Sequence, residues 1–282
     1  MGARPEFRLI ASDIDGTLVA ADRILSPGTL STLGRLPEMG VAFAFVTGLN
    51  PWVTERFVSA LGPWSRGICL NGVFTLEGGR RVAGQVIDPE VAREAVSLSL
   101  DLGYVPLVYG EDHVSRYLAH QPDGANHGGG MVKIRHLIVE RPYQPYVGVE
   151  SFEALFTVPP AQVAICETPE RGAALFPVLD RALGERAYVV LQPGETTWVE
   201  IAHPEARKDR GLMAMAHRLG LSAEQVLYFG DNLNDLPVFE AFPYTVAVAN
   251  ARPEISKLAW RTTTSNVEDG VARFIAEWFD LD

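Results

Sequence analysis

The chain has 282 residues, of which 47% are hydrophobic and 21% charged, a balance typical of a folded protein with a sizeable apolar core. Its formal net charge of −11 argues against a nucleic-acid partner that binds through a basic surface. The N-terminal residues lack the features of a secretory signal, no apolar stretch is long enough to span a bilayer, and the two cysteines favour a reducing compartment. We therefore expect a soluble, cytoplasmic protein of one or two domains without a membrane partner, and the oligomeric state stays open.

The first 80 residues alternate between short apolar runs and helical patterns. Strands are expected at 7–12, 41–48 and 67–72. Two helices are expected to begin at Ser26 and at Asn50, because each of these capping residues is followed by a proline in the first helical position. This alternation favours a parallel α/β sheet.

The pattern changes near residue 80. Helices are expected from Asp88 to about residue 102 and from Thr168 to about residue 183, and strand-like runs occur at 104–110, 161–167 and 187–193. From about residue 192 the first pattern returns, with strands at 197–203, 226–231 and 244–250 and helices at 208–219, from about 235 and at 267–280.

The order of these elements predicts the fold class. We expect a doubly wound, mainly parallel, Rossmann-like α/β core built from residues 1–81 and 191–282. Residues 82–190 are expected to form an inserted α+β domain.

Two aspartates, Asp13 and Asp15, follow the first predicted strand in the sequence DIDGT. The carboxyl end of a parallel strand faces the crevice where α/β proteins bind ligands, and both side chains point to one side if the chain is still extended. Two carboxylates so close raise each other's pKa unless a cation lies nearby, and Mg²⁺ prefers such oxygen ligands. An EF-hand is excluded because the sixth position of the loop is not glycine and the twelfth is not acidic. Taken alone, the stretch could also be a simple Asp-Gly turn.

Three further oxygen-bearing side chains, Asp231, Asn234 and Asp235, follow the strand at 226–231. Taken alone they could form a solvated turn and a helix cap. Next to Asp13 and Asp15, however, they supply the additional ligands that a magnesium site requires.

Two weaker signals complete the pattern. Thr47 and Gly48 end a third predicted strand just before a helix, where a hydroxyl and backbone amides can hold phosphate oxygens. Lys208 stands at a predicted helix start, where the helix dipole does not favour a cation, so that a nearby anion would explain it. Either feature could also be structural, as a helix entry or a surface lysine.

Together these segments resemble the four motifs of the haloacid dehalogenase superfamily of phosphotransferases, which are DxDGT[LI], [ST]G, a lysine and GDxxND in that order. The chain is most similar to the Cof-like phosphatases, whose large α/β cap lies between the second and third motifs. The sequences CLNG at 69–72 and VEIAHPEARKDRGL at 199–212 resemble the segments that flank that cap. One departure is Leu49, because many Cof-like members carry arginine directly after the second-motif glycine. It leaves open any substrate or interdomain contact that this arginine makes.

The resemblance implies a phosphatase that acts on a small phosphorylated metabolite, with a sugar phosphate as the family default and the cap selecting the substrate. Asp13 would attack phosphorus and form an aspartyl-phosphate. Asp15 would protonate the leaving alcohol and then activate the hydrolytic water. Thr47, the amide of Gly48 and Lys208 would bind the phosphoryl group and stabilise its charge.

The resemblance also implies a Mg²⁺ cofactor. Its ligands would be Asp13, the backbone carbonyl of Asp15 and Asp231, with Asn234 as a further ligand or as a neighbour of the phosphate. Asp235 would orient Lys208 without binding the metal ion itself.

Other functions stay open. A phosphomutase uses the same nucleophile but returns the phosphoryl group to a sugar, and a non-catalytic protein could bind a phosphorylated ligand without turnover. A phospho-accepting receiver module is disfavoured because such domains have about half this length and lack an inserted cap.

The predicted cap also contains four of the six histidines, at positions 113, 120, 127 and 136. A zinc site is conceivable, but these spacings match no familiar ligand pattern, and exposed histidines are the simpler interpretation. The HGGG run at 127–130 resembles an esterase oxyanion loop, yet the chain has no G-x-S-x-G elbow, so that a flexible loop is expected.

Overall fold

The computed structural model describes residues 4–120, 130–140 and 144–281. The chain divides into two compact units, which are Met1–Gly84 with Arg207–Asp282, the core unit, and Gln85–Ala206, the inserted unit. Among the described residues, no helix combines the length and the apolar character needed to cross a membrane.

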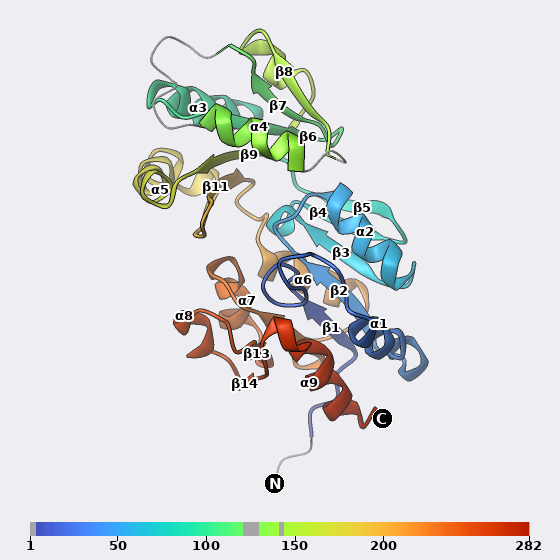
Figure 1. Ribbon diagram of the computed structural model, residues 1–282. Helices are drawn as coiled ribbons and strands as arrows, with labels where there is room; N and C mark the ends of the chain where they lie inside the picture. Colours follow the sequence, from blue (N-terminus) through green and yellow to red (C-terminus); the bar gives the residue numbers. More distant parts are fainter. Residues whose placement is uncertain (1–3, 121–129, 141–143, 282) are drawn as a thin grey trace. The chain divides into compact units, whose positions relative to one another are not determined.

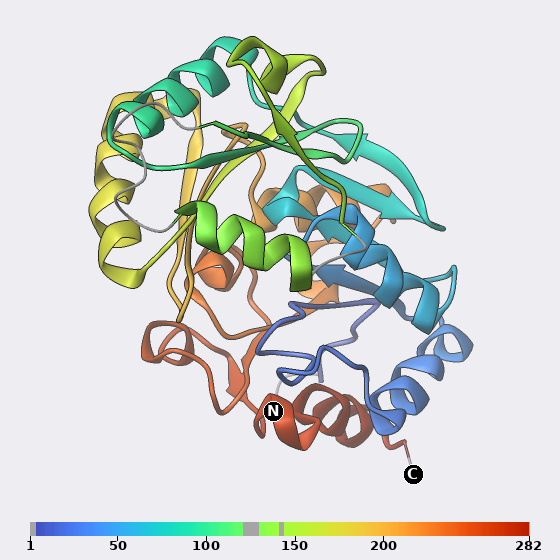
Figure 2. The ribbon, with the colours of Figure 1, turned by 45° about the horizontal axis from the view of Figure 1, so that its top comes forward.

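The core unit is built on an eight-stranded sheet (Figure 1). Its strands follow the order β14-β13-β12-β1-β2-β3-β4-β5, and all neighbours from β14 to β3 are parallel, whereas β4 and β5 are antiparallel. The strand bounds are β1 Leu9–Ser12, β2 Ala42–Val46, β3 Arg66–Cys69, β4 Phe74–Glu77, β5 Arg80–Gly84, β12 Val226–Gly230, β13 Thr245–Ala247 and β14 Arg261–Thr262. β1 pairs with both β2 and β12, so the C-terminal part of the chain returns to the N-terminal strands (Figure 2).

Helices cover both faces of this sheet. Their bounds are α1 Pro27–Gly34, α2 Pro51–Leu61, α6 Lys208–Arg218, α7 Leu236–Ala241, α8 Pro253–Ser256 and α9 Gly270–Phe279. On one face Leu9 packs in a buried cluster with Leu212 of α6 and Val238 of α7. On the other, the ring of Phe229 contacts Phe274 of α9. This two-sided burial confirms the doubly wound, mainly parallel α/β fold.

The helix starts follow from local chemistry. The side chain of Ser26 accepts a hydrogen bond from the amide of Thr29, and that of Asn50 accepts one from Val53, with a proline next in each case. These contacts satisfy amides that the first helical turn leaves without partners. Both caps were expected from the sequence.

The inserted unit is built on a second, mixed sheet of six strands in the order β10-β11-β9-β6-β7-β8. The strand bounds are β6 Pro106–Gly110, β7 Ser115–Leu118, β8 Tyr146–Val149, β9 Pro160–Glu167, β10 Tyr188–Gln192 and β11 Thr197–Ala202. Helices α3 (Pro89–Asp101) and α5 (Pro169–Leu183) pack on one face, and α4 (Gly130–Glu140) contributes Ile134 and Leu137 to a cluster on the other. In both units, the described residues also form short 3₁₀ turns: Leu36–Met39, Leu70–Gly72, Glu153–Phe156, Gly184–Arg186, Ala223–Gln225, Leu233–Asp235 and Asn266–Glu268.

One strand was assigned to the wrong unit. The run at 197–203 was expected in the core, and the boundary at 190/191, but β11 pairs antiparallel with β9 and β10 in the inserted sheet. Its apolar side chains Val199 and Ile201 belong to the cluster beneath α3 and α5. The inserted unit therefore extends to Ala206. A buried strand has the same sequence pattern in either sheet, so the error follows from the lack of partner information.

Candidate active site

The predicted site residues lie at the carboxyl ends of neighbouring strands. Ser12 at the end of β1 is in register with Phe229 of β12 and with Phe45 of β2. Asp13 follows directly, and its amide donates a 2.9 Å hydrogen bond to the carbonyl of Phe229. Asp231 comes directly after β12 and Thr47 directly after β2. The parallel register thus places these side chains along one edge of the sheet, where α/β folds bind ligands.

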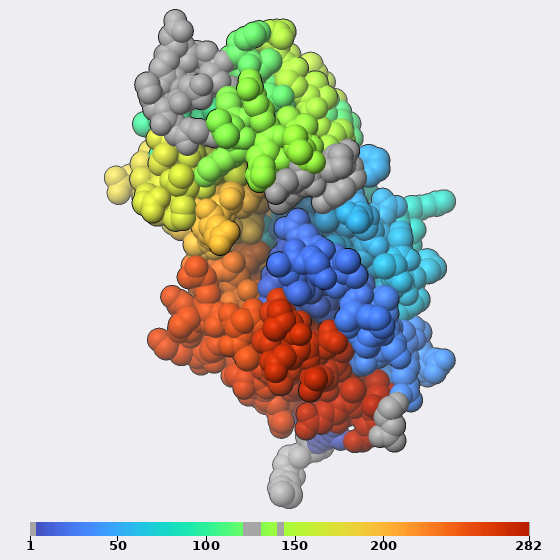
Figure 3. All heavy atoms as spheres, in the orientation of Figure 1, coloured from blue at the N-terminus to red at the C-terminus, as the bar shows by residue number. Residues whose placement is uncertain are grey.

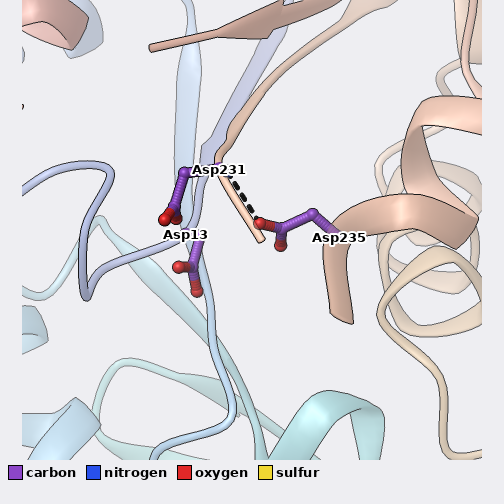
Figure 4. Close-up of side chains that lie close together, drawn as sticks. All are labelled: Asp13, Asp231 and Asp235. Carbon is purple, nitrogen blue, oxygen red and sulfur yellow. Dashed lines mark hydrogen bonds between the residues drawn. The ribbon is translucent and has the colours of Figure 1, made fainter. Parts of the chain in front are cut away.

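Three carboxylates meet at this edge. Asp13, Asp231 and Asp235 each have an oxygen within 4.8 Å of the others, and Figure 4 shows the side chains of Asp13 and Asp231 directed at the same space. Asp13 is 5% exposed and Asp235 is fully buried. Three like charges so close together, two of them buried and Asp231 partly buried, are unfavourable without cations, so the cluster needs a compensating positive charge.

Lys208 supplies one such charge. Its ammonium Nζ donates to Oδ1 of Asp13 at 2.7 Å and to Oδ1 of Asp235 at 2.6 Å, although the residue is only 1% exposed. Burial lowers the pKa of Lys208, but the attraction of the two carboxylates outweighs this effect and the pKa is raised overall. The lysine therefore stays charged, and the anion expected next to this helix start is present.

Asp235 is saturated with hydrogen bonds. Its Oδ1 accepts from Lys208 and from the hydroxyl of Tyr228 at 2.6 Å, and its Oδ2 accepts from the amides of Asp231 at 2.9 Å and Asn232 at 3.0 Å. The bond from the Asp231 amide is the dashed line in Figure 4. Four donors occupy the acceptor positions that a carboxylate offers, so Asp235 holds Lys208 and the 231–232 turn rather than a metal ion.

The pKa values in the cluster show how strongly it requires a cation. Burial raises the pKa of Asp13 well above its ordinary value, and the repulsion of Asp235 and Asp231 adds to this, while Lys208 opposes it. Burial and the charge of Asp235 raise the pKa of Asp231 to about 7. Lys208 alone therefore does not compensate the three carboxylates.

The potential metal ligands of this site suit a hard cation. Oδ2 of Asp13 accepts no hydrogen bond from the residues that the structure describes, and Oδ1 of Asp231 accepts one from the hydroxyl of Thr17 at 2.6 Å. The side-chain NH₂ of Asn234 donates to Oδ1 of Asn71 at 3.1 Å. The group of Asn234 that could bind a cation is therefore its side-chain carbonyl oxygen. Gly16 allows a close approach, because its φ is +82° and a Cβ there would lie 2.6 Å from Oδ2 of Asp231. The atoms available as metal ligands are all oxygens, which Mg²⁺ prefers.

Asp15 lies outside the three-carboxylate cluster. Its side chain is paired with Arg23, whose Nε donates to Oδ1 at 2.7 Å and whose NH2 group donates to Oδ2 at 3.2 Å. Both side chains are about one third exposed. The carboxylate of Asp15 is therefore separate from the group around Asp13, and it is accessible to solvent.

Thr47 and Gly48 begin the loop after β2. Thr47 is 2% exposed, its amide donates to the carbonyl of Ile68 at 2.8 Å, and its hydroxyl accepts from the amide of Leu49 at 3.1 Å. The carbonyl of Thr47 accepts from the amide of Asn71. These bonds fix the loop between β2 and α2 at the same sheet edge, while Gly48 and Leu49 remain partly exposed.

Sequence reasoning missed three residues of this site. Asn71 lies in the CLNG segment, and its φ of +55° indicates a turn that asparagine tolerates. Tyr228 lies in a segment that was expected to be a strand, and no expectation for Arg23 followed from the sequence. Each acts through a partner that the local sequence does not indicate.

The zinc site that the histidine spacing left conceivable is not found among the described residues. His120 has a side chain that is 85% exposed and lies 3.3 Å from Glu150. The residues described include one group of three or more potential metal-ligating acids, cysteines or histidines, and that is the aspartate cluster. The first three residues of the HGGG run, His127, Gly128 and Gly129, lie outside the described residues.

The sequence as a whole matches one family. The family model for haloacid dehalogenase-like hydrolases aligns with residues 10–275. The chain belongs to this family. This confirms the resemblance drawn from the four motifs, and the chain is a phosphatase of the Cof-like type.

Curated relatives agree with this assignment, and a solved structure shares the fold. A pyridoxal phosphate phosphatase of Escherichia coli is 25% identical over 95% of this chain and 97% of its own length. A 5-amino-6-(5-phospho-D-ribitylamino)uracil phosphatase of Bacillus subtilis is 27% identical over 97% and 98%. The crystal structure of a haloacid dehalogenase-like hydrolase from Bacteroides thetaiotaomicron superimposes with a TM-score of 0.80 at 20% identity, covering 96% of this chain and 99% of that one. The last comparison concerns the fold alone.

Proposed function

We propose that this phosphatase is Mg²⁺-dependent and hydrolyses a small phosphorylated metabolite through a phosphoryl group carried on Asp13. The observation that supports it most is the contact between Lys208 and Oδ1 of Asp13, which leaves Oδ2 without a hydrogen bond from the described residues. A buried carboxylate with one oxygen fixed by a cation and the other open is oriented for nucleophilic attack.

In the first step, an oxygen of Asp13 forms a bond to phosphorus as the bond to the leaving alcohol breaks. Asp15 gives its proton to the departing oxygen, so that a neutral alcohol leaves. In the second step, a water molecule attacks phosphorus, Asp15 takes its proton, and the bond to Asp13 breaks to release inorganic phosphate. Asp15 thus ends each cycle in its starting protonation state.

The other site residues bind charge. Lys208 holds Asp13 in place and balances part of the negative charge on the transferring group. The hydroxyl of Thr47, the amide of Gly48 and the side chain of Asn234 are proposed to bind phosphate oxygens.

Asp13, Asp231 and the backbone carbonyl of Asp15, with Asn234 nearby, are the residues that would hold Mg²⁺. The ion would neutralise the nucleophile and the phosphate oxygens so that two anions can approach each other. The raised pKa values of Asp13 and Asp231 support this assignment, because burial and the neighbouring carboxylates make the charged forms unfavourable and a bound cation would offset this.

The substrate class comes from the relatives. The relatives named above are phosphatases of pyridoxal phosphate and of 5-amino-6-(5-phospho-D-ribitylamino)uracil, which supports a small phosphorylated metabolite for this chain. A sugar phosphate remains our first expectation, and selection of the substrate by the inserted unit stays a prediction. A cytoplasmic location also stays a prediction.

The test is phosphate release from a panel of sugar, nucleotide and vitamin phosphates. Wild type and Asp13→Asn are compared, each with Mg²⁺ and with EDTA. We expect release that requires both Asp13 and the metal, with a loss of at least about a thousand-fold in the variant. Release that persists in Asp13→Asn would contradict the proposal. Turnover that appears only after addition of a sugar bisphosphate, without net phosphate release, would instead indicate a phosphomutase.

A further inference from the structure

The loop that carries Asp15 is a tight turn around one carbonyl. The amides of Thr17, Leu18 and Val19 all donate to the carbonyl of Ile14, at 3.3, 3.0 and 3.1 Å. The carbonyl of Gly16 is not used within this turn, and that of Val19 takes part only in the isolated bridge between Asp15 and Val19, so both can accept from partners elsewhere. The turn itself fixes the loop's shape but not its position relative to the sheet.

Two asparagines from the C-terminal part of the chain supply those partners. Nδ2 of Asn250 donates to the carbonyl of Gly16 at 2.7 Å, and Nδ2 of Asn266 donates to the carbonyl of Val19 at 2.8 Å. The amide of Asn266 also donates to Oδ1 of Asn250 at 3.0 Å. We call this pair the asparagine bracket. Its members are 234 and 247 residues from the carbonyls that they hold, so the contacts do not arise from local turn formation.

The bracket is anchored to the rest of the site. Asn250 follows β13, and two residues later the amide of Arg252 donates to the carbonyl of Asp231 at 2.9 Å. Asn266 begins the 3₁₀ turn before α9, which packs beside α1. Figure 3 shows the C-terminal and N-terminal segments of the core unit meeting on its surface. The bracket therefore ties the Asp15 loop to the segment that holds Asp231.

The conformational freedom of Gly16 means that the loop needs such a contact to hold it in place. Its φ of +82° and its lack of a side chain leave the peptides on either side of it free to rotate unless they are held. One of those peptides carries the carbonyl of Asp15. Arg23 cannot fix the loop against the sheet, because it belongs to the same segment and would move with Asp15. The bracket reaches this loop from another part of the fold and holds its backbone carbonyls, whereas the hydroxyl of Thr17 bonds to Asp231 through a side chain.

We propose that Asn250 and Asn266 are positioning residues that hold the Asp15 loop in its working geometry. The inference rests on the proposed function, in which Asp15 gives and takes a proton in each cycle. Because a displacement of about 1 Å at a reacting group can cost about a hundred-fold in rate, the loss of one arm of the bracket should slow the chemical step.

The test compares Asn250→Ala, Asn250→Asp and Asn266→Ala with Lys257→Ala. Asn250 is exposed, so its removal leaves no buried cavity, and Asn250→Asp keeps the size and the acceptor while removing the NH₂ donor. Lys257 is an exposed residue of the same segment, at the end of α8, and serves as the matched control. For each protein we measure kcat, KM, Tm and the hydrogen exchange of the amides at positions 17–19.

We expect kcat to fall by about ten- to a hundred-fold in both Asn250 variants, with KM and Tm close to those of Lys257→Ala. Exchange at 17–19 should become faster. The double variant at 250 and 266 should be less impaired than the product of the single effects, because the two side chains form one unit.

An unchanged kcat in Asn250→Asp would overturn the inference, as would unchanged exchange at 17–19. A fall in Tm together with parallel changes in kcat and KM would show that the bracket only stabilises the fold in general. That result would also contradict the inference. Wild-type protein that releases no phosphate would contradict the proposed function instead, and the exchange rates would still decide whether the bracket holds the loop.

Discussion

Lys208 and Asp13, which are 195 residues apart in the sequence, are joined by a 2.7 Å hydrogen bond between buried charged groups. The same ammonium also bonds to Asp235, so a single lysine joins the start of α6 to the residue after β1 and to the 3₁₀ turn that follows β12. We expect this arrangement to matter both for the stability of the fold and for the proposed chemistry.

Replacement of this lysine should therefore affect both properties. Lys208→Met leaves two buried carboxylates without their cation, and the free energy of unfolding should fall by about 3 kcal/mol. Phosphate release should fall by at least about a hundred-fold. Urea unfolding and steady-state assays measure the two effects. Lys257→Met, which replaces an exposed lysine, is the matched control and should stay within about 0.5 kcal/mol of wild type. A Lys208→Met protein as stable as this control would contradict the ion-pair account.

Asp231→Asn should stabilise the metal-free protein at high pH. The pKa of Asp231 is raised from an ordinary 3.8 to about 7, so the folded state holds a proton that the unfolded state has lost between these values. Its stabilising contribution is complete below about pH 4 and is lost as the pH rises through 7. At pH 8 the charged Asp231 is therefore a cost, and asparagine removes it.

The measurement is Tm in EDTA at pH 5 and pH 8. The variant should gain on wild type as the pH rises, and added Mg²⁺ should stabilise wild type more than the variant. If the difference in Tm between wild type and Asp231→Asn is the same at both pH values, the charged form of Asp231 does not destabilise the metal-free protein.

Gly72→Ala should disturb the start of α6. Gly72 has a φ of +117°, and a Cβ there would lie 2.5 Å from the carbonyl oxygen and 2.7 Å from the nitrogen of Arg207. Because these are backbone atoms, the chain next to Lys208 must shift. We expect a loss of about 2 kcal/mol or more in the free energy of unfolding and a lower kcat.

Gly34→Ala is the control for that substitution. Gly34 lies in α1 with no atom within 4 Å of the added Cβ, so alanine there should be neutral or stabilising by up to about 1 kcal/mol. If the two alanine variants unfold alike in urea, the close approach of Gly72 to Arg207 does not constrain the site.

Much of the core could be predicted from the sequence because its signals are local. Ser26 and Asn50 cap their helices as the sequence indicates, and short apolar runs became parallel strands. Asp13, Asp231 and Thr47 could be placed at one sheet edge because each ends a predicted parallel strand. The family motifs then added the order in which these residues occur.

The elements that were missed depend on partners distant in sequence. β11 joined the inserted sheet because of its pairing with β9, which no local pattern encodes. The hairpin of β4 and β5 was also missed, since β5 is exposed along its whole length and has no apolar alternation to indicate a strand.

The same reason explains the missed side chains. Asn71 and Arg23 are ordinary loop residues until their partners Asn234 and Asp15 are known. Asn250 and Asn266 carry no signal that they reach Gly16 and Val19. Positioning contacts of this kind are set by tertiary structure, whereas the reacting residues lie in contiguous motifs.

The most direct test of the central claim uses Asp15→Asn with 4-nitrophenyl phosphate, whose leaving group needs no proton. Without a base to activate water, the variant should release one 4-nitrophenolate per enzyme in a rapid burst and then stall. Acid-quenched protein should carry one phosphoryl group on Asp13, and Asp13→Asn should show neither burst nor label. Steady release by Asp15→Asn at the wild-type rate, or a burst with no phosphoryl group on Asp13, would contradict covalent catalysis by this aspartate.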